Sequence, residues 1–406
     1  MKAFSDLCVC IQDQCSPATS GASFYVGLEH IGSGTFFLRR HGSPADVQSA
    51  KTRFRKGDIL YGKLRPYLDK AVIAPFDGIC STDILVFRAK SDVCPTYLLA
   101  LIHAAEFRTH ADQTTNGVNH PRTSWHGLAG FGWEVPPKRK QEKIAAILWK
   151  IQRAIEVEEK LIATTRELKQ AAMRQLFTHG LRGEPQKKTE IGLMPQSWAV
   201  LPLSHLTSET ETVDLAREGA RSILYVDVSS VSRHLLQITS AQQYLLADAP
   251  GRARKKILEG DVIFATVRPT LLRVARVEQK HHDQVCSTAF CVLRDKNPNT
   301  KGHFLLYLVQ RPQFVNQLAQ IETGASYPAV TDRQVKSQLV PVPHDDEQRD
   351  IANILKAIDQ KISFHERKRT NLQDLFQTLL HQLMTATIRM DKLDIDTSEV
   401  ATTPTE

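Results

Sequence analysis

The chain contains a long imperfect repeat, and this repeat constrains its fold more than any other feature. Residues 57–68, beginning Gly57-Asp58, recur as residues 260–271, beginning Gly260-Asp261, at an offset of 203. Further blocks recur in the same order: residues 80–82 at 286–288, and residues 144–151 at 351–358. Several blocks in one order at a nearly constant offset indicate a duplicated unit of about two hundred residues.

The first part of each unit mixes short apolar runs with turn signals. Ile59-Leu60-Tyr61 follows Gly57-Asp58, and Val262-Ile263-Phe264 follows the matching pair in the second copy. Such runs, bounded by turn residues, are typical of β-strands. A helix is expected to follow near residues 95–110 and 302–319, where apolar residues cluster. Each first part is therefore predicted to be an α/β globular module.

The second part of each unit is predicted to be a long helix that begins after prolines, at Pro136-Pro137 and at Pro341-Val342-Pro343. The spacing of its apolar seam alternates between four and three residues, which is typical of a coiled coil. Residues 144–176 would form a helix of about 50 Å at about 1.5 Å per residue. The seam positions are Ile144, Leu148, Ile151, Ile155, Glu158, Ile162, Thr165, Lys169, Ala172 and Leu176, then Ile351, Leu355, Ile358, Ile362, His365, Arg369, Leu372, Phe376, Leu379 and Leu383.

Neither apolar seam can remain exposed to water, so the two helices are expected to pair with each other. An antiparallel pair about a pseudo-two-fold axis suits a tandem duplication, and pairing centre to centre predicts a contact between Glu158 and Arg369. The predicted fold class is α+β. Its predicted parts are modules at 1–135 and 181–342, long helices at 136–180 and 343–388, and an unstructured polar tail at 389–406.

Composition restricts the class of protein. No apolar run approaches the roughly 18 residues of a membrane helix, and residues 1–6 lack the basic-then-apolar order of a secretory signal, so we expect a cytoplasmic protein without a membrane partner. Seven cysteines, an odd number, favour reduced thiols. Cys8, Cys10 and Cys15 lie close together but form no Cys-x-x-Cys pair, so we expect no metal site.

Catalytic signatures are scarce. Gly62-Lys63 is followed by Leu64, so it is no phosphate-binding P-loop. One enzymatic alternative is a metal-dependent nuclease that uses Asp261, Glu278 and Lys280 as a carboxylate cluster. Residues 76–78 of the first copy lack the Glu-x-Lys element, which weakens this alternative. Asp58 and Asp261 are better interpreted as turn residues that follow a glycine.

Residues suited to DNA binding are better represented, and the net charge of +8 favours a polyanionic partner if the charge clusters. Arginine, asparagine, tyrosine and threonine can contact phosphates or base edges. Two polar loops are the candidates in each copy, although each residue could be an ordinary turn residue and Arg65 and Arg268 could belong to the framework. The candidates are Lys63, Arg65, Tyr67, Asn116, Asn119, His120 and Arg122, and in the second copy Thr266, Arg268, Thr270, Ser326 and Tyr327.

Framework positions repeat between the copies, whereas the polar loop positions do not. Arg65 and Gly117 return as Arg268 and Gly324, but Lys63 and Asn119 are replaced by Thr266 and Ser326. Two modules of one fold are therefore expected to read two different targets.

The sequence resembles the specificity subunits of type I restriction-modification systems. The resemblance rests on the doubled Gly-Asp-[Ile/Val]-x-[Tyr/Phe]-x-x-[Leu/Val]-Arg-Pro-x-Leu block, the doubled Gln-x-x-Ile-Ala-x-Ile-Leu-x-x-Ile helix start, and the Pro195-x-x-Trp198 segment that opens the second half. It covers about residues 20 to 385. The first half departs from the pattern, because no counterpart of Pro195-x-x-Trp198 precedes its module.

The resemblance implies a non-catalytic, sequence-specific DNA-binding subunit. It implies two target recognition domains that each read one half of a bipartite, asymmetric site, with the two helices fixing the unread spacer. It also implies two methyltransferase subunits, which methylate adenine N6 with S-adenosylmethionine, and two restriction subunits that use ATP and Mg²⁺. This chain itself would hold no cofactor, and the seam helices would dock the partners. A coiled-coil scaffold without sequence specificity remains an alternative from another class.

Overall fold

The computed structural model describes residues 1–214, 218–233, 235–300, 302–388 and 395–398. Of the tail predicted at 389–406, residues 389–394 and 399–406 lie outside the described residues. The chain divides into two compact units. Unit 1 comprises Met1–Leu161 and His365–Glu406, and unit 2 comprises Ile162–Phe364. Each unit therefore contains one globular module and half of each long helix.

Unit 1 is built on two four-stranded sheets. The first has the order β2-β9-β6-β7 and is antiparallel throughout, and the second has the order β3-β5-β8-β4, in which only β4 and β8 are parallel. A short pair, β1-β10, lies apart from both. The strands are β1 (Lys2–Ala3), β2 (Cys8–Ile11), β3 (Gln14–Cys15), β4 (Tyr25–Val26), β5 (Lys51–Phe54), β6 (Ile59–Gly62), β7 (Ala71–Ile73), β8 (Gly78–Cys80), β9 (Ile84–Ala89) and β10 (Gly132–Trp133).

Unit 2 repeats the first sheet and the three central strands of the second. Its sheets have the orders β14-β23-β20-β21 and β18-β15-β22-β19, in which β19-β22-β15 corresponds to β5-β8-β4. The fourth strand of the second sheet differs, because β3 lies beside β5 in unit 1 whereas β18 lies beside β15 in unit 2. The strands of these sheets are β14 (Thr207–Ser208), β15 (Ser222–Val226), β18 (Gln242–Leu245), β19 (Ala253–Ile257), β20 (Val262–Ala265), β21 (Val274–Arg276), β22 (Gln284–Ser287) and β23 (Phe290–Asp295). The shared topology confirms the duplicated α/β fold predicted from the repeat.

Three further strand pairs complete unit 2. They are β11 (Gln186–Thr189) with β12 (Gly192–Pro195), β13 (Ala199–Pro202) with β24 (Leu339–Val342), and β16 (Val231–Ser232) with β17 (Gln237–Ile238). The β13-β24 pair corresponds to β1-β10 of unit 1, so the first module has this edge strand although its sequence lacks the Pro-x-x-Trp approach. Trp198 itself is buried, and its indole N–H donates to Glu347 at 3.1 Å.

Each module was expected to contain one helix after its strands, but the structure has two shorter helices there. In unit 1, Ala104 is extended between α2 and α3, and in unit 2 Arg311 is extended before Pro312, which disfavours a helical conformation in the preceding residue. The short helices are α1 (Phe4–Leu7), α2 (Pro95–His103), α3 (Ala105–Gln113), α4 (Trp125–Ala129), α7 (His303–Leu308), α8 (Pro312–Ile321) and α9 (Asp332–Ser337).

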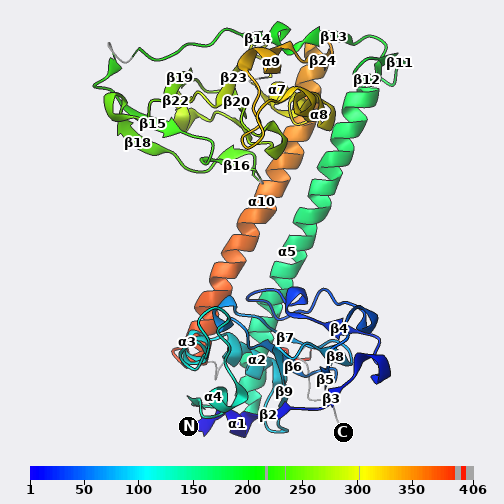
Figure 1. Cartoon of the computed structure of the whole chain (residues 1–406), viewed down its shortest axis with the longest axis vertical. Helices are drawn as coiled ribbons and strands as arrows, with labels where there is room; N and C mark the ends of the chain where they lie inside the picture. The colour runs from blue at the N-terminus through cyan, green and yellow to red at the C-terminus, as the bar shows by residue number, and fades with distance from the viewer. Residues whose placement is uncertain (215–217, 234, 301, 389–394, 399–406) are drawn as a thin grey trace. The chain divides into compact units, whose positions relative to one another are not determined.

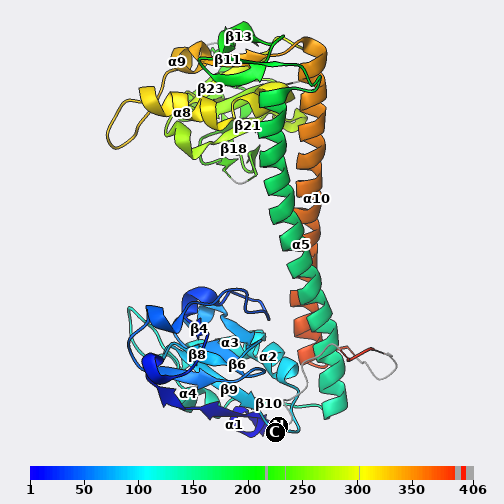
Figure 2. The same cartoon turned by 90° about the vertical axis from the view of Figure 1, so that its right-hand side faces the viewer.

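Two long helices, α5 (Lys138–His179) and α10 (Asp345–Met384), run alongside each other within each unit (Figure 1, Figure 2). In unit 1 the core contains Ile144 and Leu148 from the start of α5 together with Phe376 and Leu380 from the end of α10. In unit 2 the end of α5 meets the start of α10, where the Lys169 ammonium lies 2.7 Å from the Asp359 carboxylate. Opposite halves pair in each unit, so the helices are antiparallel, as predicted.

The central seam contact differs from the prediction. Glu158 pairs with His365 and Lys368 rather than with Arg369: its carboxylate oxygens lie 2.7 Å from His365 Nδ1 and 2.7 Å from Lys368 Nζ. The prediction was wrong in the partner because midpoint matching fixes a helix register only to within a turn. The side chain that completes the contact depends on rotamers that spacing does not specify.

A repeated glutamine lies at the fourth residue of each long helix. Gln141 donates through Nε2 to the Pro136 carbonyl at 2.9 Å, and Gln348 donates in the same way to the Pro343 carbonyl at 3.0 Å. Both side chains are almost fully buried. The proline pair and the glutamine together fix the point at which each module passes into its helix.

Candidate nucleic-acid interface

Each module holds an arginine in a left-handed backbone conformation three residues after the end of an inner strand, β6 or β20. Arg65 has a φ of 53° and Arg268 a φ of 49°, and each precedes a 3₁₀ turn, η4 (Pro66–Leu68) or η7 (Pro269–Leu271). This conformation is uncommon for residues other than glycine and persists only where the surroundings enforce it. Its repetition makes these turns rigid elements of the framework.

A second loop is tied to each of these turns. The Arg65 N–H donates to the Pro121 carbonyl at 2.8 Å, and the Arg268 N–H donates to the Pro328 carbonyl at 2.7 Å. Gly117 and Gly324 bend the second loops with φ values of 95° and 104°. A Cβ at either glycine would lie 3.1–3.2 Å from a carbonyl oxygen, so a side chain there would be both crowded and strained. The two predicted clusters of each module thus meet on one surface.

In unit 1 most of the predicted contact residues are exposed on this surface. Arg65, Tyr67, Asn116, Asn119 and His120 are exposed, and Lys63 is half-buried. Val118, which is 98% exposed at the tip of the Gly117 loop, was not among the predicted contact residues. Its position between Gly117 and Asn119 in a polar loop could have marked it as a candidate, because apolar contacts also read base edges.

Arg122 is part of the surface but its guanidinium is engaged. Nε and Nη2 donate to the two carboxylate oxygens of Asp83 at 2.8 and 3.2 Å. These hydrogen bonds hold the pKa of the Asp83 carboxyl below its ordinary value. Arg122 therefore braces the Gly117 loop, and a contact with DNA would have to use the side of the guanidinium that Asp83 leaves open.

Unit 2 presents a different set of side chains on the same frame. The Arg268 guanidinium lies 5.0 Å from the centroid of the Tyr327 ring and donates to the Ser326 carbonyl at 3.0 Å. Thr270, Ser326 and Tyr327 are exposed. Thr266, in contrast, is buried and its hydroxyl donates to the Ala289 carbonyl at 2.9 Å, so it is not a surface residue, contrary to the prediction.

The carboxylates of the nuclease alternative do not assemble. Asp261 is buried and accepts both edge hydrogen bonds of Arg294 at 3.0 Å, whereas Glu278 and Lys280 form an exposed pair at 3.1 Å. Asp58 and Arg88 repeat the arrangement of Asp261 and Arg294 in unit 1. Within the described residues, no cluster of histidine, cysteine and carboxylate side chains could hold a metal ion. The two aspartates are turn residues of the framework, as predicted.

Seam residues of the long helices hold the helices and modules together. Ile144, Leu148, Ile155, Ile162, Ile351 and Leu355 are buried. Ile151, Ile358, Ile362, Arg369 and Leu372 are only partly buried. The large apolar side chains that α5 presents to solvent lie outside the seam and were not predicted: Val157 is 53% exposed, Leu161 38% and Leu168 54%. Val157 and Leu161 are four residues apart and therefore share one face of the helix.

Two further predictions were that the cysteines do not form disulfides and that no helix spans a membrane. All seven cysteines are free, and burial raises the pKa of several, including Cys8 and Cys286. Among the helices of the described ranges, none combines the length and apolar character required to cross a membrane.

Comparison with known proteins gives a consistent result. The family model described as type I restriction modification DNA specificity domain matches residues 45–165 and 237–374. The chain is 24% identical over 333 residues to the type I restriction enzyme MjaVIII specificity subunit of Methanocaldococcus jannaschii, covering 78% of this chain and 76% of that protein. It is 23% identical to the putative MjaX specificity subunit of the same organism, covering 89% and 86%.

Solved structures show a similar fold. A type I restriction-modification system S subunit from M. genitalium matches with a TM-score of 0.59 at 12% identity, covering 94% of this chain and 95% of that one. A chain from a study of the assembly and conformational transition of the type I restriction-modification system matches with a TM-score of 0.51 at 18% identity, covering 94% and 96%.

Proposed function

We propose that each of the two target recognition domains of this chain, which belongs to the family of type I restriction-modification DNA specificity subunits, reads one half of a bipartite, asymmetric DNA site. The two domains lie in tandem along the chain. One observation carries this proposal. The Arg65 and Arg268 turns are joined to the Gly117 and Gly324 loops by the same backbone hydrogen bond, yet the exposed side chains on them differ. A shared frame with different side chains suits two readers of different sequences.

Recognition would combine phosphate contacts with contacts to base edges. Lys63, Arg65 and Tyr67 in unit 1 can bind phosphate oxygens and set the register of the duplex. Asn116 and Asn119 carry the amide that can pair with adenine in the major groove. In unit 2 the exposed Arg268, Thr270, Ser326 and Tyr327 take these roles. The α5–α10 pair would fix the length of the unread spacer.

Catalysis in this family belongs to partner subunits, and this chain is the non-catalytic member. The partners would be two methyltransferase subunits, which use S-adenosylmethionine to methylate adenine N6, and two restriction subunits, which use ATP and Mg²⁺. The complex would act on double-stranded DNA in the cytoplasm. Val157 and Leu161 on α5 are the apolar surface that we assign to docking of a methyltransferase subunit, because the buried seam residues are occupied within the chain.

Methylome sequencing of cells with and without the gene tests the proposal. A bipartite N6-methyladenine motif that disappears with the gene would support it. The control is that the methyltransferase subunits are present and active with another specificity subunit. If no motif then depended on the gene, a scaffold without sequence specificity would be favoured instead.

A further inference from the structure

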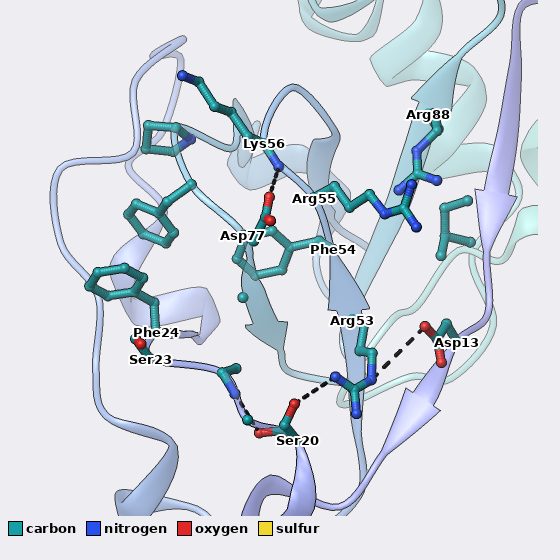
Figure 3. A pocket seen from close by; sticks show the side chains of 16 residues that line it. Asp13, Ser20, Ser23, Phe24, Arg53, Phe54, Arg55, Lys56, Asp77 and Arg88 are labelled. Atoms are coloured by element: carbon teal, nitrogen blue, oxygen red, sulfur yellow. Dashed lines mark hydrogen bonds and ion pairs between the residues drawn. The ribbon is translucent and has the colours of Figure 1, made fainter. Parts of the chain in front are cut away.

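Unit 1 contains an open cavity of about 850 Å³ at the C-terminal end of β5 (Figure 3). Three segments enclose it: Ser20–Phe24, Arg53–Lys56 and Pro75–Gly78, with Arg88 reaching in from β9. Its lining includes four cationic side chains, Arg53, Arg55, Lys56 and Arg88, and two carboxylates, Asp13 and Asp77. No sequence pattern predicted this cavity, because Arg53, Arg55 and Lys56 stand before the repeated block rather than within it.

The positive charges of the four cationic side chains are neutralised to different extents by neighbouring groups. Arg88 is neutralised by Asp58 through two hydrogen bonds at 2.8 Å. Arg53 donates to the Ser20 carbonyl at 2.6 Å and lies 4.0 Å from the Asp13 carboxylate. Across the described part of the chain, no hydrogen bond or ion pair engages the Arg55 guanidinium or the Lys56 ammonium. Asp77 accepts the backbone N–H of Lys56 at 2.7 Å, so it fixes the loop and not the ammonium.

The wall facing these cations is aromatic. The ring centroids of Phe24 and Phe76 are 4.3 Å apart, and those of Phe54 and Phe76 are 6.2 Å apart. Because the rings pack on one another, a base cannot slide between them, but they offer an apolar surface. A phosphate beside Arg55 could place its attached sugar against such a wall.

Unit 2 provides an internal comparison. The strand registers of β5-β8 and β19-β22 align Arg53 with Lys256, Arg55 with Leu258, and Lys56 with Glu259. Lys256 is already paired with Asp283 at 3.0 Å and with Glu211 at 3.6 Å. The second module therefore keeps the framework pair Asp261–Arg294. At the positions that correspond to Arg55 and Lys56, it has Leu258 and Glu259 and so no cation.

We infer that this cavity binds a phosphate of the DNA backbone beside the half-site read by unit 1, and that unit 2 lacks the corresponding contact. The inference rests on the proposed function. Arg55 supplies the contact, Lys56, whose side chain points away from that of Arg55 in Figure 3, adds only to the local positive charge, and the phenylalanine wall contacts the sugar. Ile11 lines both this cavity and a second one of about 500 Å³ that includes Lys63, Thr123 and Ser124. The shared Ile11, together with Thr52 and Arg53, which are consecutive in β5 and line one cavity each, places the two cavities side by side.

The test replaces Arg55 with the residue of the second module. The full chain, bound to its methyltransferase subunits, is titrated with two duplexes at several salt concentrations: one carries the motif found by methylome sequencing, and the other a scrambled motif. Arg55→Leu is expected to weaken binding of both duplexes equally and to flatten the dependence of log K on log salt by about 0.9, the value for one lost phosphate contact. Lys188→Leu, which removes an exposed charge from β11, is the matched control and should leave the slope unchanged.

Two further variants sharpen the result. Leu258→Arg is expected to steepen the salt dependence, and Arg55→Lys should retain most of the wild-type slope. An Arg55→Leu slope equal to that of the wild type, with motif preference intact, would overturn this inference while the proposed function stands. A wild-type complex that does not distinguish the two duplexes would overturn the proposed function itself. Free deoxyadenosine monophosphate is the second probe. The inference would also be overturned if Arg55→Leu lowered the affinity for this nucleotide but left the slope of log K against log salt for duplex binding unchanged.

Discussion

The Asp58 carboxylate accepts two hydrogen bonds from the Arg88 guanidinium, both at 2.8 Å, across neighbouring strands of one sheet. One of its oxygens also accepts the Arg55 backbone N–H at 2.8 Å, which closes the turn before β6. Asp261 repeats these bonds with Arg294 and with the Leu258 N–H. A carboxylate saturated in this way in both copies has a structural role, and it explains why a Gly-Asp pair opens each repeated block.

Replacement of this aspartate should destabilise the module that contains it. Asp58→Ala is expected to lower the free energy of unfolding of unit 1 by about 2 kcal/mol, since three hydrogen bonds are lost while the partly exposed Arg88 can still be hydrated. Chemical denaturation of the full chain, followed by hydrogen exchange of each unit, would measure the loss. Glu278→Ala is the matched control at an exposed carboxylate and should change neither unit. Equal losses in both variants would contradict the structural role.

Modular recognition predicts half-site effects from loop substitutions. Asn119→Ala removes an exposed amide from the Gly117 loop and should relax or change only the half-site read by unit 1, with a loss of about 1–3 kcal/mol for the affected base pair. Arg65→Ala should act on the same half-site. Ser326→Ala in unit 2 is the counterpart and should affect the other half.

Methylation motifs from cells that express each variant would show these effects directly. If Asn119→Ala weakened both half-sites equally, the two modules would not be independent readers.

The depressed pKa of Glu158 predicts a pH-dependent helix contact. Its hydrogen bond with Lys368 is the largest cause and outweighs the opposing effect of burial, and with the hydrogen bond from His365 it holds the pKa of Glu158 below its ordinary value of 4.5. A carboxyl whose pKa is lowered by folding stabilises the folded state above its unfolded pKa, and this contribution disappears as pH falls through the folded value. Glu158→Gln should therefore destabilise unit 1 by about 1 kcal/mol at neutral pH.

Below pH 4.5 the difference between wild type and Glu158→Gln should shrink towards zero. Thermal unfolding across this pH range is the measurement, with Glu167→Gln as the control at an exposed position of α5. A difference that persists undiminished in acid would show that the contact does not depend on the charge of Glu158.

The repeat and the seam spacing predicted the architecture because both reflect backbone geometry that the two copies share. Gly57, Arg65 and Gly117 occupy backbone conformations or turns that recur at Gly260, Arg268 and Gly324, so self-comparison reveals them. Side-chain partners could not be predicted in the same way. The burial of Thr266 depends on packing against distant strands.

The ion pair between Arg122 and Asp83 could not be predicted either, because the two residues are far apart in the sequence and the repeat does not mark them as partners. The cationic cavity of unit 1 was missed for the opposite reason, because Arg55 and Lys56 differ between the copies and so left no repeated pattern.

The exposed apolar face of α5 predicts where a partner subunit docks. Val157 and Leu161 lie on one helical face in water, whereas the seam beside them is buried, so an arginine at Leu161 should be tolerated by the fold but not by an apolar interface. Leu161→Arg is expected to weaken binding of the methyltransferase subunit by about tenfold or more, or about 1.4 kcal/mol. Co-purification and titration of the two purified proteins would measure this loss, while gene-dependent methylation should fall in parallel.

The matched control is Leu193→Arg, which places the same charge at a similarly exposed leucine on β12. Because β12 lies outside the long helices, this variant should bind the methyltransferase subunit as the wild type does. If Leu161→Arg bound normally, or if Leu193→Arg were equally impaired, the docking surface would have to lie elsewhere. Since neither substitution reaches the buried seam, unchanged thermal unfolding of both variants would separate lost docking from a disturbed helix pair.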